Sequence, residues 1–379
     1  PVGMAMVAMT ALIGPIMGPL LGGWLTENYS WHLSFTINLP IGLVQLAMIM
    51  FAIPATSTRL GELRNADWLG IVGMVLSLGC VTTMLEEGHR ERWFESSLIW
   101  GLAAASLLGC IVVAAGQFMA ARPVVQLALF RNRSVSVSVV LMTICGMLLY
   151  GTLFLTPQFL AAIAGYNALQ AGQVIFWAGV IGIFAAFLFP LMVRQLDLRL
   201  VVCVAICNLA IGAFVAGRLT SASTGIDLLI PQLFFGVGMA LTVMPLQQIV
   251  MFAVDKEDAP EANGLISVAR NLGGALGLAM IAAIQDYRSD THHWQLNSGI
   301  GANAPEVQHQ LEQMANMLGG GPEGMTAALR AFDGMVQREA YVMAFNDLFL
   351  LFGALAIVAT PLVLLIRKPA RPMSSLPVH

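Results

Sequence analysis

Arg270 is a charged side chain about seven residues inside an apolar stretch that begins near Gly264. A charge in the middle of a membrane helix costs about 2.5–3.5 kcal/mol on insertion scales. A partner carboxylate, water in a cavity or a bound substrate would offset that cost, which makes Arg270 a candidate for substrate or proton handling. Alternatively, its side chain extends to the nearby membrane surface, because Asn263 is less than two turns away.

Other polar and aromatic side chains in or beside apolar stretches would suit a pocket for hydrophobic compounds. They are Tyr150, Phe154, Gln158, Gln232 and Asn271. Together with 22 methionines, which adapt to ligands of different shape, they would accept apolar cations or uncouplers. For each of them, ordinary packing between helices is the alternative.

Asp347 lies near the end of the last apolar stretch, where it either takes up a proton or sits at the membrane interface. The sequence offers no nucleophile elbow, phosphate loop or metal-ligand spacing, so we expect neither an enzyme nor a cofactor or metal. His292 and His293 lack a ligand pattern and are expected to be solvated. No basic stripe indicates a nucleic-acid partner.

A glycine pattern marks the beginning of the sequence. Gly14, Gly18 and Gly22 recur every four residues, so on a helix they leave one face without side chains, where another helix can approach closely. Pro15 and Pro19 each remove a backbone donor and bend the helix. Gly22 is followed by Gly23. A bent helix with a glycine face suits a seam between moving parts, although a static packing seam has the same pattern.

The composition is that of an all-α, polytopic membrane protein. The sequence is 58% hydrophobic and 10% charged, with a mean hydropathy of +0.80. Apolar stretches of roughly 20 residues are long enough to cross a bilayer. The predicted spans lie near residues 3–25, 34–53, 68–86, 97–119, 134–156, 171–192, 200–218, 228–253, 264–284 and 341–366.

The distribution of basic residues predicts the orientation. Short connections on one side, together with the C-terminal tail, hold eleven Lys and Arg residues, and those on the other side hold three. Basic residues concentrate in cytoplasmic loops. Both ends are therefore predicted to be cytoplasmic, and the long connection 285–340 is predicted to lie outside.

Several motifs in this order resemble the 14-helix drug:proton antiporters of the major facilitator superfamily. Residues 14–23 fit the family's antiporter pattern G-x-x-x-G-P-x-x-G-G at each fixed position, and residues 31–42 resemble the entry to its sixth helix. Pro157-Gln158, Pro231-Gln232 and Arg270-Asn271-Leu272-Gly273-Gly274 resemble later family helices. The resemblance implies proton-coupled export of hydrophobic compounds by alternating access.

The resemblance also implies a division of the chain. Residue 1 would fall in the fifth of fourteen family helices, so the first four, which hold the family's coupling residues, are expected to be missing. Residues 1–53 would complete the N-terminal bundle, 54–133 would form a linker with two extra helices, and 134–379 would form the C-terminal six-helix bundle. Asp197 and Arg199 resemble a reduced form of the superfamily's cytoplasmic gating motif.

The expected location is the bacterial inner membrane. For a protein there, the resemblance implies a periplasmic membrane-fusion adaptor and, through it, an outer-membrane channel. The connection 285–340 is long enough to dock such a partner, and it contains a predicted helix from Glu306 to Met317. A disordered insertion is the alternative for this segment. For the whole chain, the alternative is a membrane scaffold or sensor that keeps the fold without transporting.

Overall fold

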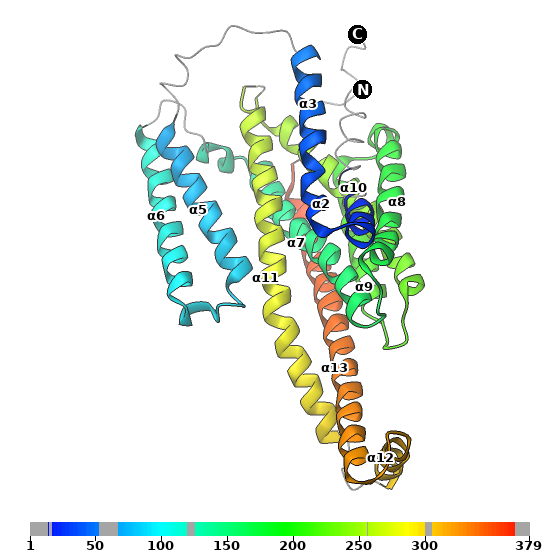
Figure 1. Ribbon diagram of the computed structural model, residues 1–379. Helices are drawn as coiled ribbons and strands as arrows, with labels where there is room; N and C mark the ends of the chain where they lie inside the picture. Colours follow the sequence, from blue (N-terminus) through cyan, green and yellow to red (C-terminus); the bar gives the residue numbers. More distant parts are fainter. Residues whose placement is uncertain are drawn as a thin grey trace.

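The computed structural model describes residues 14, 17–52, 67–119, 126–255, 257–299 and 305–367. In these ranges the chain forms helices joined by turns, without strands (Figure 1). Residues 17–28 are helical and precede the labelled elements. The labelled α-helices are α2 (Trp31–Thr36), α3 (Asn38–Ala52), α5 (Trp68–Glu87), α6 (Ser97–Met119), α7 (Arg133–Ala162), α8 (Ala168–Gln195), α9 (Leu198–Ala216), α10 (Gly225–Ala253), α11 (Ala259–Gly299), α12 (Pro305–Met317) and α13 (Gly321–Ala359). Three short 3-10 helices are η1 (Trp93–Glu95), η2 (Leu127–Arg131) and η3 (Thr360–Leu365).

The predicted membrane spans agree with these helices. Within the described residues, nine segments are long and apolar enough to cross a bilayer, and each coincides with one predicted span. The remaining prediction, 3–25, falls mostly outside the described residues. The all-α membrane fold is therefore confirmed.

Helices α7 to α11 and α13 form a bundle with a continuous apolar core. Its largest fully buried side chains include Phe159 of α7 and Phe345, Phe349 and Phe352 of α13. The rings of Phe159 and Phe345 meet edge to face, with centroids 5.4 Å apart. Such a pair adds about 0.5–1.5 kcal/mol beyond the burial of its area. These aromatic contacts fix α13 against α7.

Helices α5 and α6 form a separate pair beside the bundle (Figure 1). They approach each other closely because Gly73 lies against the backbone nitrogen of Val113 and Gly109 against that of Ser77. The turn after α5 reaches α11, where His89 Nε2 lies 2.7 Å from Asp286 Oδ2. The predicted division of the chain into three parts stays a prediction.

The connection 285–340 is not the long loop that the sequence suggested. Helix α11 has 41 residues and α13 has 39, which is about 60 Å of helix each. A hydrocarbon core is about 30 Å thick, so both helices continue well beyond it. They form a hairpin with α12 packed at its tip (Figure 1). The predicted helix 306–317 is confirmed as α12.

Glycines make the turn between α12 and α13. Gly319, Gly320 and Gly321 have φ angles of 111°, 70° and 63°, a region that other residues rarely adopt. The Gly320 N–H donates to the Ala315 carbonyl at 2.8 Å and closes the end of α12. We call the part of α11 beyond Gln285, α12, and the part of α13 before Tyr341 the outer hairpin.

We expect a membrane-impermeant maleimide to label Ser298→Cys in intact spheroplasts but not Glu257→Cys. Ser298 is exposed on the outer hairpin, and Glu257 is exposed at the opposite end of the bundle. The native protein is the control, because its five cysteines lie within helices. Labelling of Glu257→Cys alone would reverse the orientation.

Candidate functional site

The helix that carries the glycine pattern meets α8. A Cβ at Gly23 would lie 2.6 Å from the Ala168 carbonyl oxygen, and one at Gly172 would lie 2.6 Å from that of Pro19. The Ala168 N–H donates to Glu27 Oε1 at 3.2 Å, so Glu27 caps α8. The first helix thus touches the start of α8 backbone to backbone, with no side chain between.

The glycine row itself faces no neighbour in the described structure. A Cβ at Gly14, Gly18 or Gly22 would meet no described atom within 4 Å. The close approach predicted for this row is made instead by Gly23 and Pro19, on another side of the helix. Pro15 lies outside the described residues.

Tyr150 and Asn271 meet through their side chains where α7 meets α11, and Arg270 directly precedes Asn271 on α11. The Tyr150 hydroxyl donates to Asn271 Oδ1 at 3.3 Å. The Tyr150 ring fits over Gly274, where any Cβ would be 2.6 Å from it. Gly146 of α7 lies against the backbone of Arg270, so the two helices almost touch at this level. Of the predicted cavity residues, these three form one group.

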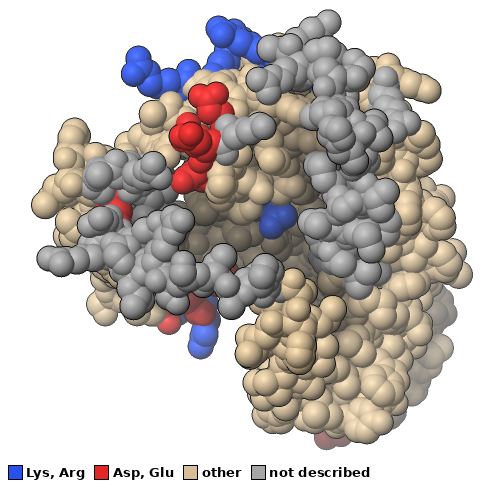
Figure 2. Space-filling view, turned by 90° about the horizontal axis from the view of Figure 1, so that it is seen from above, with Lys and Arg blue, Asp and Glu red and all other residues tan. Residues whose placement is uncertain are grey.

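Arg270 keeps a polar atom without a protein partner. Its Nε is buried and makes no hydrogen bond among the described residues. A buried unpaired donor costs about 1–3 kcal/mol, more if charged, so it marks a place for water or a ligand. Seen from the end opposite the outer hairpin, the molecule is hollowed at its centre, with a basic side chain visible in the wall and acidic side chains at one edge (Figure 2).

The other predicted cavity residues are dispersed. Gln232 is buried and donates to the Thr156 hydroxyl at 3.1 Å, which ties α10 to α7. Gln158 has a buried Oε1 without a partner, whereas the Phe154 side chain is exposed. Gln232 is therefore engaged in packing, and Gln158 stays available.

Asp197 and Arg199 do not pair with each other through their side chains in the described structure. Asp197 Oδ1 accepts from the Arg199 N–H at 3.1 Å and caps α9. The Arg199 side chain has a buried Nε without a partner.

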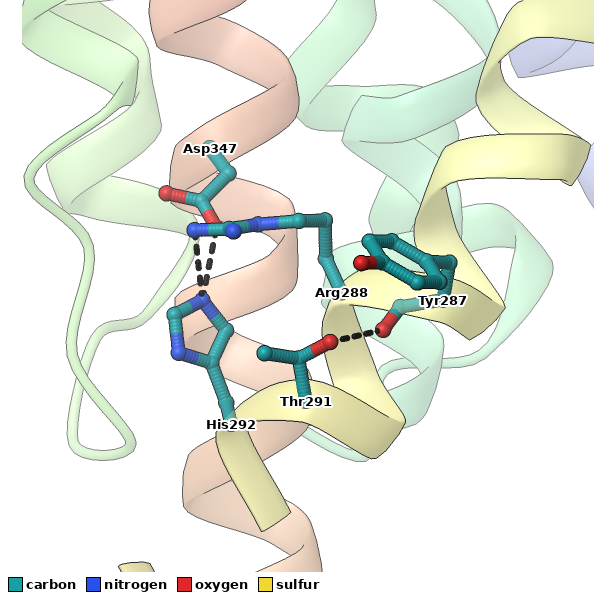
Figure 3. Close-up of polar contacts among 5 residues, drawn as sticks. All are labelled: Tyr287, Arg288, Thr291, His292 and Asp347. Carbon is teal, nitrogen blue, oxygen red and sulfur yellow. Dashed lines mark hydrogen bonds and ion pairs between the residues drawn. The ribbon is translucent and has the colours of Figure 1, made fainter. Parts of the chain in front are cut away.

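Asp347 joins two basic side chains of α11 (Figure 3). Its Oδ2 accepts from Arg288 Nε at 2.7 Å and lies 2.6 Å from His292 Nε2. Arg288 Nη2 lies 3.4 Å from the same His292 nitrogen. We call Arg288, His292 and Asp347 the root cluster, because they lie where the outer hairpin leaves the bundle.

The prediction that His292 is solvated was wrong. His292 is 6% exposed, because it faces α13 and Asp347, whereas His293 is part-exposed and contacts Asp333 Oδ1 at 3.1 Å. One feature of the sequence could have indicated the root cluster. Arg288 and His292 are four residues apart and share a helix face, so one carboxylate can meet both.

The comparisons with known proteins agree with this architecture. The family model described as Major Facilitator Superfamily matches residues 1–278. The chain is 28% identical over 375 residues to the multidrug export protein EmrB of Haemophilus influenzae, covering 97% of this chain and 71% of that protein. It is 27% identical to the colistin resistance protein EmrB of Acinetobacter baumannii, covering 94% and 70%. It is 26% identical to the fatty acid resistance protein FarB of Neisseria gonorrhoeae, covering 97% and 71%.

We expect Gly23→Ala to slow transport and to destabilise the protein, since the alanine Cβ must push the Ala168 backbone away. Overpacking of this kind costs about 1–3 kcal/mol. The midpoint of heat-induced aggregation in detergent should fall, and transport should slow. Gly101→Ala is the control, because nothing lies within 4 Å of a Cβ there. Equal behaviour of the two variants would show that the contact with α8 is loose.

Proposed function

Because the chain belongs to the Major Facilitator Superfamily, we propose that it exports hydrophobic toxic compounds in exchange for protons. As a member it is a multi-pass membrane transporter of the bacterial inner membrane and not an enzyme. The match along nearly the whole chain to relatives named for multidrug export carries the proposal. The antiporter pattern at residues 14–23 supports the exchange with protons.

The proton gradient supplies enough energy for this exchange. One proton that enters down the membrane potential releases about 2.3 kcal/mol per 100 mV. Since 1.4 kcal/mol corresponds to a factor of ten, one proton supports a gradient of roughly fiftyfold.

Alternating access needs helices that move against each other without large side chains between them. The backbone contact of Gly23 with Ala168, and of Gly172 with Pro19, supports a sliding seam between the first helix and α8. Arg199, whose buried Nε has no partner among the described residues, could exchange partners during such a movement, which supports a gating role.

The group of Tyr150, Arg270 and Asn271 supports a substrate-binding surface beside the line where α7 and α11 meet. It combines an aromatic ring, an amide and a guanidinium nitrogen without a partner. We propose that Arg270 contacts the substrate or the water around it. Phe154 and Gln158 have no hydrogen bond or ring contact with this group in the described structure, but they follow Tyr150 by four and eight residues on α7 and would extend the surface along that helix, whereas Asp347 belongs to a different level of the bundle.

The exchange is tested in proteoliposomes with a pH-sensitive dye enclosed. Addition of a hydrophobic compound should drive protons across the membrane, and empty liposomes are the control. A panel of ethidium, tetraphenylphosphonium and oleate covers both charge types. A scaffold or sensor that keeps the fold would move no protons with any of them.

Arg270 gives the sharper test. Arg270→Ala should lower drug-dependent proton movement by about tenfold or more, since a charge-assisted hydrogen bond is worth about 1.5–3 kcal/mol. Arg270→Lys keeps the charge and should lose less. If both variants transport like the parent at equal expression, the side chain reaches the membrane surface and has no part in transport.

Exposed apolar side chains on the outer hairpin support the proposal of a protein partner on the periplasmic side. Beyond the membrane the hairpin exposes large apolar side chains, among them Trp294, Met317 and Leu318 at 71%, 82% and 50%. Exposed apolar groups of this size are typical of protein interfaces. We propose that a membrane-fusion adaptor docks here and leads the substrate to an outer-membrane channel.

We expect the triple change Trp294→Ser, Met317→Ser and Leu318→Ser to abolish adaptor co-purification and cellular resistance. Transport in vesicles should persist, because these side chains lie outside the membrane part. Gln295→Ala with Glu312→Ala, both exposed on the same hairpin, is the matched control. Adaptor binding that survives the triple change would place the docking surface elsewhere.

A further inference from the structure

The root cluster has the properties of a proton-binding site. We propose that His292 takes up a proton from the outer solution as an early step of this exchange, and that Asp347 and Arg288 position the imidazole. This inference rests on the proposed exchange with protons and assigns a residue of this chain to it.

The geometry holds the imidazole in one orientation. Asp347 Oδ2 accepts a hydrogen bond from Arg288 Nε at 2.7 Å and lies 2.6 Å from His292 Nε2 (Figure 3). The two short contacts converge on a single carboxylate oxygen. A carboxylate that accepts from an arginine and a histidine remains ionised, because both partners favour its charged form. His292 is therefore the group of the cluster that is free to gain a proton.

The proton would bind at the second ring nitrogen. His292 Nδ1 is buried and has no hydrogen-bond partner among the described residues. In the neutral ring, Nε2 carries hydrogen toward Asp347, and Nδ1 keeps a free lone pair. Proton uptake forms one N–H bond at Nδ1 and changes the charge of the cluster from zero to plus one. Release breaks the same bond.

Buried polar groups continue inward along the same face of α11. Ser289 and Gln285 lie three and seven residues before His292, and all three are buried. Gln285 Nε2 also has no partner among the described residues. Buried polar atoms without protein partners are usually satisfied by ordered water. Such water would connect His292 to the membrane part of the bundle.

The cluster lies at the boundary of the membrane. The apolar run of α11 ends at Ile284, just before Gln285, and Asn346 and Asp347 interrupt the apolar run 341–366 of α13 near its outer end. Protons from the outer solution reach this level without crossing the hydrocarbon layer. His292 and Asn271 lie on one continuous helix, about 30 Å apart along its axis. A change at the cluster can therefore be transmitted to the candidate cavity by a rigid element.

The surrounding charged groups are largely committed to other partners. Asp286 of α11 pairs with His89 from the turn after α5. Arg338 of α13 donates to the carbonyl oxygens of Ile163, after α7, and Ser221, between α9 and α10. Other groups of these elements that titrate or carry charge are Tyr341 of α13, near Asp286, the exposed Tyr287 (Figure 3) and Asp290 of α11, the pair of His293 with Asp333, and the exposed Arg218 after α9.

The deciding variant is His292→Gln, with His293→Gln as the matched control. Glutamine keeps a donor for Asp347 but does not titrate between pH 5 and 8, where histidine gains its charge. We measure proton movement from pH 5.5 to 8.5 with the compound that drives it in the parent protein. His292→Gln should move no protons with the drug and lose the pH dependence, yet still exchange labelled drug without a proton gradient. His293→Gln should match the parent.

A second variant covers the case in which His292→Gln does not insert. Asp347→Asn removes the negative charge that favours the imidazolium, so the pH of half-maximal transport should fall. Arg288→Gln with Asp347→Asn avoids an unpaired arginine, and because it removes one positive and one negative neighbour of His292, the pH of half-maximal transport should fall less than in Asp347→Asn. An unchanged pH profile in the inserted variants would overturn the proton site. A parent protein without drug-dependent proton movement would instead overturn the proposed function.

Discussion

Backbone groups in the hydrocarbon layer must find hydrogen-bond partners within the protein, because no water is available there. Each apolar segment that the structure describes is therefore a helix, and the side chains decide how the helices meet. Where α7 meets α11, glycines take the place of larger side chains, so the two backbones come into contact. Gly273 lies against the backbone of Thr143, and Gly277 against that of Met147. Apolar surface alone does not drive helices together in lipid, so such close approach carries the packing.

Beyond the membrane, α11 and α13 are held together by polar contacts. The root cluster joins them at the boundary, and the pair of His293 with Asp333 joins them further out. Asn346 exchanges two hydrogen bonds with the backbone of Leu219 and ties α13 to the end of α9. The outer hairpin is therefore a built extension of the bundle, and a partner bound to it would be mechanically connected to the membrane part.

The sequence predicted the spans well because the length and apolarity of a helix in lipid are local properties. It did not predict the outer hairpin, because the helices there are polar and are held by contacts between distant residues. His292 meets Asp347 across 55 positions, so its neighbours in the sequence gave no reason to expect burial. The glycine row shows a similar limit. Its spacing defines one face of the helix, but α8 packs against the side on which Gly23 lies. The grouping of Tyr150 with Asn271, 121 positions apart, likewise needed the fold.

The distribution of unpartnered polar atoms bears on the choice between a transporter and a scaffold. Of the seven buried side-chain atoms without a partner in the described structure, three belong to α11: Arg270 Nε, Gln285 Nε2 and His292 Nδ1. Each such atom costs about 1–3 kcal/mol relative to a paired one. A scaffold would be more stable with apolar side chains at these positions, since nothing in its role needs a buried group without a fixed partner. An exporter does need such groups, because protons and substrates must be bound and then released, and a helix that carries them from the cavity to the outer boundary suits that role.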